Sequence, residues 1–116
     1  MEFREKQAIY LQIADYICDN ILNGKHQPEE KILSVREMAV KLEVNPNTVM
    51  RTYDLLQQQN IIFNKRGIGF FVAIGAKEII IQNRKKRFFE TQLPDFFKTI
   101  KLLGVDIKEI LERFEG

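Results

Sequence analysis

Apolar side chains recur at spacings of three and four over residues 7–23, which is the pattern of an amphipathic helix. The stripe consists of Tyr10, Ile13, Ala14, Ile17, Ile21 and Leu22. The polar side chains expected on the opposite face are Gln12, Asp15, Asp19 and Asn20. Gly24 ends the pattern, and a polar loop follows. Cys18 lies at the edge of the stripe, so we interpret it as a packing residue.

Two shorter helical patterns come next, with a proline between them. Ser34 is typical of an N-cap, and Glu37 completes a capping box for a short second helix. Pro46 cannot continue that helix, but its missing N–H is not needed at the first position of a new one. Asn45 is therefore the expected N-cap of a third helix that runs to about Gln59. Two helices joined by such a tight turn form a helix-turn-helix.

Each helix of this motif has an inward and an outward face. The expected core positions are Val35, Met38, Ala39 and Leu42 in the second helix and Val49, Tyr53 and Leu56 in the third. The side chains expected to point outward from the third helix are Asn47, Thr48, Met50, Arg51 and Asp54. Free N–H groups at the start of that helix suit a phosphate.

A pair of β-branched and aromatic runs, residues 61–64 and 70–73, flanks a glycine-containing basic turn. This pattern predicts a β-hairpin. Residues 1–75 are therefore expected to form a winged helix-turn-helix. Residues 76–116 carry an amphipathic helical pattern, in which Pro94 is the candidate position of a kink and Asp106 caps a last helix. The predicted fold is mainly α with a small β-hairpin, followed by a short helical dimerisation tail.

Composition places the chain among ordinary globular proteins. Of its 116 residues, 45% are hydrophobic and 29% are charged. The longest apolar run has five residues, which is too short for a membrane span, and the charged start of the chain lacks the apolar core of a signal peptide. A single cysteine excludes an internal disulfide. We therefore expect a cytoplasmic protein that has no membrane partner.

Charge is balanced over the chain as a whole. Residues 1–75 hold nine Lys/Arg and nine Asp/Glu, whereas residues 76–116 hold nine and seven. A nucleic-acid binder must then concentrate its positive charge locally. Positive charge is concentrated between Asp54 and Glu78, because this segment contains the basic turn and no acidic residue. The overall balance also leaves open an alternative, a winged-helix protein-interaction module that lacks specific DNA binding.

From Tyr10 to Val72 the chain resembles the DNA-binding domain of the GntR family of bacterial transcription regulators. The resemblance rests on "IYLQIADYI", "ILSVREMAVKLEVNPNTVMRTYDLL" and "KRGIGFFV". The short helical tail is similar to that of the YtrA-type subfamily, which lacks a large effector-binding domain. What the resemblance implies is a homodimeric repressor that binds an inverted repeat in double-stranded operator DNA and excludes polymerase.

The resemblance also implies which residues contact DNA. The candidate set is Ser34, Arg36, Asn45, Asn47, Thr48, Arg51, Lys65, Arg66 and Gly67. Many members carry arginines where Pro46 and Met50 stand here, and we expect Arg51 to substitute in part. Asn and Arg can form bidentate bonds with adenine and guanine, each worth about 1–3 kcal/mol of discrimination.

Each of these assignments has a plainer alternative. The asparagine at position 45 can serve as a cap alone, and Arg36 can form a surface ion pair with Glu37 or Glu43. The basic turn and the "RKKR" tract at residues 84–87 can simply be solvated, with auxiliary phosphate contacts as the second interpretation of the tract.

Aromatic residues in the tail predict a dimer interface, which we assign to Phe88, Phe89, Phe96, Phe97 and Ile100. Burying the four rings yields on the order of 6–12 kcal/mol, comparable with the estimated cost of association of about 4–15 kcal/mol. The alternative is that the rings pack against their own domain. A two-fold dimer matches a palindromic DNA site.

Catalytic and cofactor chemistry finds no support. His26 is the only histidine, and one histidine with one cysteine cannot form a usual zinc site. The sequence "GIG" lacks the third glycine of a dinucleotide fingerprint. We therefore expect neither an enzyme nor a cofactor or metal. No pattern identifies a small-molecule effector.

Overall fold

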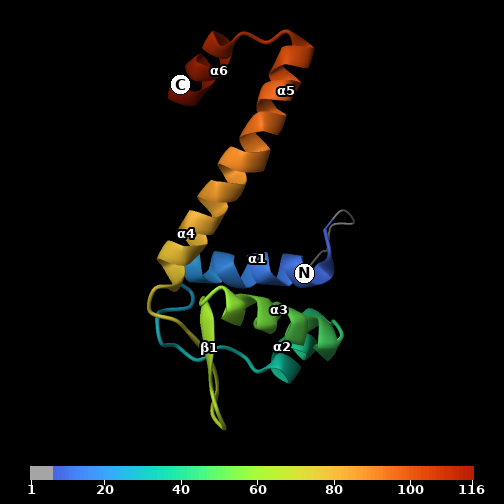
Figure 1. The fold of residues 1–116 in the computed structure, drawn as a ribbon, viewed down its shortest axis with the longest axis vertical. Helices are drawn as coiled ribbons and strands as arrows, with labels where there is room; N and C mark the ends of the chain where they lie inside the picture. The colour runs from blue at the N-terminus through green and yellow to red at the C-terminus, as the bar shows by residue number, and fades with distance from the viewer. Residues whose placement is uncertain (1–6) are drawn as a thin grey trace. The chain divides into compact units, whose positions relative to one another are not determined.

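The computed structural model describes residues 7–116 and is mainly helical, with one antiparallel hairpin (Figure 1). Its elements are α1 (Ile9–Leu22), α2 (Val35–Leu42), α3 (Pro46–Gln58), β1 (Ile62–Lys65), β2 (Gly69–Val72), α4 (Ala76–Arg87), the π-helical turn η1 (Phe88–Gln92), α5 (Leu93–Leu103) and α6 (Ile107–Glu115). The predicted winged helix-turn-helix is confirmed. The chain divides into two compact units between Ile81 and Gln82.

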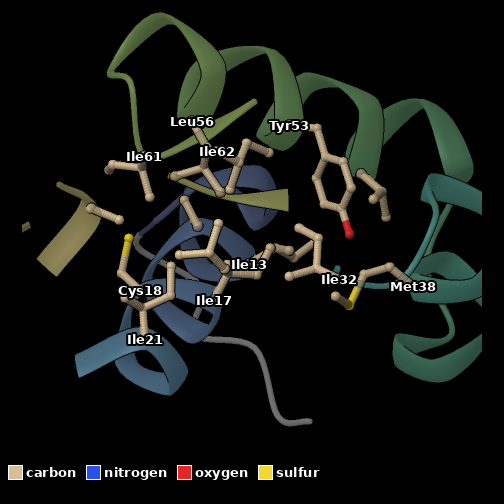
Figure 2. Packing of buried hydrophobic residues seen from close by; sticks show 14 of the residues in the cluster. Ile13, Ile17, Cys18, Ile21, Ile32, Met38, Tyr53, Leu56, Ile61 and Ile62 are labelled. Atoms are coloured by element: carbon tan, nitrogen blue, oxygen red, sulfur yellow. The ribbon is translucent and has the colours of Figure 1, made fainter. Parts of the chain in front are cut away.

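A single core holds the first unit together (Figure 2). Its buried side chains come from α1, α2, α3, the hairpin and the start of α4, and include Ile13, Ile17, Met38, Ala39, Val49, Tyr53, Leu56, Ile62, Val72 and Ile80. The predicted inward faces of α1, α2 and α3 are thereby confirmed. Cys18 is buried in the same cluster, as its interpretation as a packing residue requires.

Two polar residues of α1 differ from expectation. Gln12 and Asn20 were expected on the solvent face, but both are buried. The Gln12 side chain donates a hydrogen bond to the Gln7 carbonyl at 2.7 Å, so the segment preceding α1 gives it a polar partner. The backbone carbonyl of Asn20 accepts the His26 N–H at 3.1 Å. The loop after α1 thus packs back onto the helix, which the helical period alone does not reveal.

The hairpin is joined by a third extended segment. Phe63 pairs with Phe71, and the strands close at the pair Lys65 and Gly69, one residue displaced from the predicted runs. Lys31 forms a bridge with Phe71 from the other side of β2. In Figure 1 the hairpin projects away from α1. Its base is therefore fixed by the segment that leads into α2.

Helix α4 begins in the first unit. Ala76 and Ile80 are buried in its core, so the structural division lies six residues after the predicted boundary at residues 75 and 76. The helical irregularity in the second unit is η1, which ends two residues before Pro94 and has α-helix on both sides. Pro94 stands in the first turn of α5, where its missing N–H interrupts the regular hydrogen-bond pattern of the helix. No residue from 82 to 116 is buried.

Two local details complete the description. Gly104 ends α5 with a φ of 68°, and the Asp106 side chain caps α6 by accepting the Lys108 N–H at 2.9 Å, as predicted. Within residues 7–116 no helix combines the length and apolar character that a membrane crossing requires.

Candidate nucleic-acid interface

The start of α2 is fixed by a reciprocal pair of hydrogen bonds. The Glu37 N–H donates to Ser34 Oγ at 3.1 Å, and the Ser34 N–H donates to Glu37 Oε1 at 2.9 Å. The bond from the Ser34 backbone lowers the pKa of the Glu37 carboxyl below its ordinary value. The Ser34 hydroxyl therefore serves as the N-cap of α2. Among the candidate DNA-contacting residues, it lies two positions before Arg36.

Arg36 stands exposed on the first turn of α2. The Glu37 carboxylate is directed back to the Ser34 N–H in the capping box and forms no ion pair with Arg36. No carboxylate within residues 7–116 lies within ion-pair distance of the Arg36 guanidinium. The surface ion pair that sequence reasoning offered as an alternative is therefore not formed in the described part of the chain.

An open hollow of about 490 Å³ lies between α2 and the start of α3. Its lining residues are Arg36, Ala39, Val40, Val44 and Pro46. One guanidinium thus borders a surface that is otherwise apolar. The hollow adjoins the corner between the two helices of the helix-turn-helix.

The start of α3 projects side chains outward, and its N–H groups are used internally. Asn45 Oδ1 accepts the Asn47 N–H at 2.8 Å, and the Asn45 carbonyl accepts the N–H groups of Thr48 and Val49 at 3.0 and 3.3 Å. Since Pro46 has no N–H and those of Asn47, Thr48 and Val49 are bonded to Asn45, the first turn of α3 offers a phosphate no free N–H. Capping by Asn45 is confirmed. The exposed side-chain amide of Asn47 makes no hydrogen bond within residues 7–116.

Arg51 is held by the neighbouring helix. Its guanidinium carbon lies 3.9 Å from the centre of the Tyr10 ring on α1. Beside it, the buried Thr52 hydroxyl donates to the Tyr10 carbonyl at 2.7 Å. These contacts fix α1 against one flank of α3 and leave Arg51 exposed but oriented. Sequence reasoning did not identify Tyr10 as the residue that orients Arg51.

The wing turn depends on glycine at two positions. Gly67 has a φ of 79°, and the Ile68 N–H donates to the Lys65 carbonyl at 2.9 Å, which is the conformation of a glycine-containing tight turn. A Cβ on Gly69 would lie 2.8 Å from Lys31 Cε, and its φ of 144° also favours glycine. The Lys31 side chain thus runs directly over the wing.

Basic and aromatic groups share the outer face of the wing. Lys65 Nζ lies 4.6 Å from the centre of the Phe71 ring, and Phe63 stacks on Phe71 with ring centres 5.7 Å apart. Together with Arg66 at the turn and Lys31 across β2, three cations gather in this region of the hairpin. The sequence analysis did not include Lys31 among the candidates, because its position beside the wing results from a β-bridge to Phe71, 40 residues away in the chain.

The structure brings most of the candidate residues onto the helix-turn-helix and its hairpin. The predicted interface of the tail lies in the second unit, where the rings of Phe88, Phe89, Phe96 and Phe97 are 40–62% exposed and Ile100 is half-buried. The part of the chain described holds no group of three potential metal-ligating side chains.

Comparison with known proteins identifies the helix-turn-helix and its hairpin as a known DNA-binding domain. Residues 9–72 match the family model for bacterial regulatory proteins of the gntR family. The chain is 39% identical to YhcF of Bacillus subtilis, an uncharacterized HTH-type transcriptional regulator, over 96% of this chain and 90% of YhcF. It is 31% identical to the HTH-type transcriptional repressor YtrA of the same organism, over 94% of this chain and 83% of YtrA. These proteins are transcription regulators and not enzymes.

Some solved structures are similar to nearly the whole chain, and others are similar to its DNA-binding domain alone. A GntR-family protein from Bacteroides thetaiotaomicron is 54% identical, with a TM-score of 0.79, and the match covers 93% of this chain and 94% of that one. The DNA-binding domain of AraR in complex with operator ORR3 is 26% identical, with a TM-score of 0.57, and covers 63% of this chain and 88% of the AraR domain.

Proposed function

The chain belongs to the GntR family of bacterial regulatory proteins, and on this premise we propose that it is a repressor that binds an inverted-repeat operator as a homodimer. The predicted resemblance to the family is confirmed, and the short helical tail fits the YtrA-type architecture. The regulatory class and the DNA-binding winged helix follow from membership. The mode of regulation, the dimer and the operator symmetry are our proposal.

The observation that carries the proposal is a set of exposed polar side chains around the start of α3 that make no ion pair or side-chain hydrogen bond within residues 7–116. Arg36 and Arg51 are exposed and have no carboxylate partner within residues 7–116, and the Asn47 amide is equally available. Stability alone does not account for them, since exposed polar groups contribute little to folding. Their donors match the edges of guanine and adenine in the major groove.

The proposed binding mode follows from the distribution of these groups. Helix α3 enters the major groove, where Asn47 and Arg51 contact base edges. Arg36 approaches from α2, while the wing places Lys65 and Arg66 over the flanking backbone. Because the first-turn N–H groups are bonded to Asn45, the side chains and not the helix terminus make the contacts. Occupation of the operator excludes polymerase.

Dimerisation is assigned to the second unit. Its 35 residues contain no buried side chain, yet they carry nine exposed large hydrophobic residues. Those beyond the predicted interface are Leu102, Leu103, Ile107, Leu111 and Phe114. A second copy of the same segment provides matching apolar surface, and its two-fold axis generates an inverted repeat on DNA. Because the chromosome is cytoplasmic in bacteria, the protein is placed there.

The proposal is tested by gel-shift titration with the DNA upstream of the protein's own gene and with scrambled DNA of the same length. Titrations at 50 and 200 mM salt should show specific binding that weakens by orders of magnitude as salt rises. Equal, feeble binding to both duplexes supports the alternative interaction module and contradicts the repressor.

A further inference from the structure

An apolar strip lies beside the proposed base-reading side chains. Val40 on α2 is 79% exposed and Met50 on α3 is 42% exposed. Pro46 is also exposed, and it shares the open hollow with Val40 and Val44. Exposed apolar side chains contribute nothing to the core, so their concentration at this corner requires another explanation.

The strip occupies a defined flank of α3. Away from the strip, Thr52 and Arg51 contact Tyr10 of α1. Pro46 and Met50 are four residues apart, so they lie on one side of the helix, and Pro46 lines the hollow together with residues of α2. Asn47 and Arg51 have the same spacing and form the neighbouring polar stripe. The outward face of α3 thus has a polar stripe and an apolar border.

The chemistry of the hollow indicates what can occupy it. Its lining contains one cation and no carboxylate, which favours a neutral or anionic partner. A protein interface normally covers about 800 Å² on each side, so the five residues that line the hollow do not by themselves make one and suit a small apolar group instead. Major-groove DNA presents small apolar groups beside anionic phosphates, because thymine carries a C5 methyl group.

We propose that Val40, Pro46 and Met50 read thymine methyl groups in the operator, a specificity role that rests on the proposed DNA-binding function. Asn47 bonds an adenine edge, and the apolar border accepts the methyl group of a thymine in the same or an adjacent base pair. Each half-site therefore contains A·T pairs whose thymines face the corner between α2 and α3. Arg36 contributes positive charge at the same border.

The test replaces single thymines by deoxyuridine, which removes only the methyl group. The full chain is titrated against the shortest duplex from upstream of its own gene that retains specific binding. At the thymines that face the strip, each replacement should weaken binding about fourfold, the value of one buried methyl group. Val40→Ala and Met50→Ala should lose part or all of this preference for thymine over uracil. Ile74→Ala, which truncates another exposed residue, should keep it.

Each outcome separates the inference from the proposed function. If binding is specific but no uracil replacement weakens it, the methyl readout is wrong while the regulator stands. If both variants retain the full thymine preference, the methyl groups are read elsewhere and the inference also fails. If Val40→Ala and Met50→Ala change the sedimentation of the protein without altering that preference, the strip is a contact between copies. Absence of specific binding to any duplex overturns both proposals.

Discussion

The guanidinium group of Arg51 lies over the ring of Tyr10, with 3.9 Å between the guanidinium carbon and the ring centre. One residue projects from the proposed recognition helix and the other belongs to α1, which has no assigned contact with DNA. A planar guanidinium held on an aromatic ring loses less freedom when it forms further bonds. Helix α1 therefore orients the Arg51 side chain, which we propose reads a base.

Removing the ring should therefore weaken DNA binding indirectly. We expect Tyr10→Leu to reduce specific affinity about two- to fivefold, the range of an exposed cation–π contact of about 0.5–1 kcal/mol. Tyr10→Phe keeps the ring and should bind like the original protein. Gel-shift titration of both variants, with melting curves to verify folding, measures the effect. Equal binding by Tyr10→Leu and Tyr10→Phe would show that the stacking does not matter for recognition.

Arg36 is expected to contact DNA directly. Arg36→Ala should weaken specific binding by more than about 1 kcal/mol, because no other group can replace its forked donors. Lys41→Ala removes the same charge from the last turn of α2 and serves as the matched control. Footprinting and titration measure both variants. An unchanged footprint and affinity for Arg36→Ala would exclude the residue from the interface.

Lys31 is expected to contact phosphate from the wing. Lys31→Ala should weaken binding to operator and scrambled DNA alike, and should reduce the salt dependence of binding by about one ion. Lys25→Ala, in the loop after α1, is the control for lost charge. Titrations over a series of salt concentrations give the slopes. A loss confined to the operator would instead assign Lys31 to base recognition.

Tyr53 connects the recognition helix to the segment before α2. Its hydroxyl donates to the Leu33 carbonyl at 2.6 Å, and burial raises the pKa of the phenol well above its ordinary value (Figure 2 shows the hydroxyl directed away from α3). Tyr53→Phe should lower the free energy of unfolding by about 1–2 kcal/mol, because the carbonyl loses its partner. Tyr16→Phe, on a half-buried tyrosine of α1, should change it little. Urea denaturation at one fixed protein concentration measures both.

Phe96 lies in the proposed dimer interface. Phe96→Asp should shift the protein to a monomer, because a carboxylate in an apolar interface loses its hydration. Lys98→Asp places the same side chain two residues further along α5, on a different face of the helix. Sedimentation velocity distinguishes the two oligomeric states. A dimer that persists in Phe96→Asp would place the interface elsewhere.

The sequence by itself determined the local structure of the helix-turn-helix. The Ser34 and Glu37 capping box and the Asn45 cap are made within two or three residues of chain, so residue type and spacing suffice to predict them. The inward faces followed from the helical period, since burial of an apolar stripe is the main driving force for these helices. Most of the candidate DNA-contacting residues were identified in this way, together with the family resemblance.

Only the tertiary structure decided how distant segments complete the site. It placed Lys31 over Gly69, laid Arg51 on Tyr10, and brought Val40 beside Pro46 across one hollow. These contacts depend on how loops close and how helices pack, and no short-range pattern records them. Secondary structure here follows from hydrogen bonds between near neighbours, whereas the surface offered to DNA follows from packing between segments that the chain keeps apart.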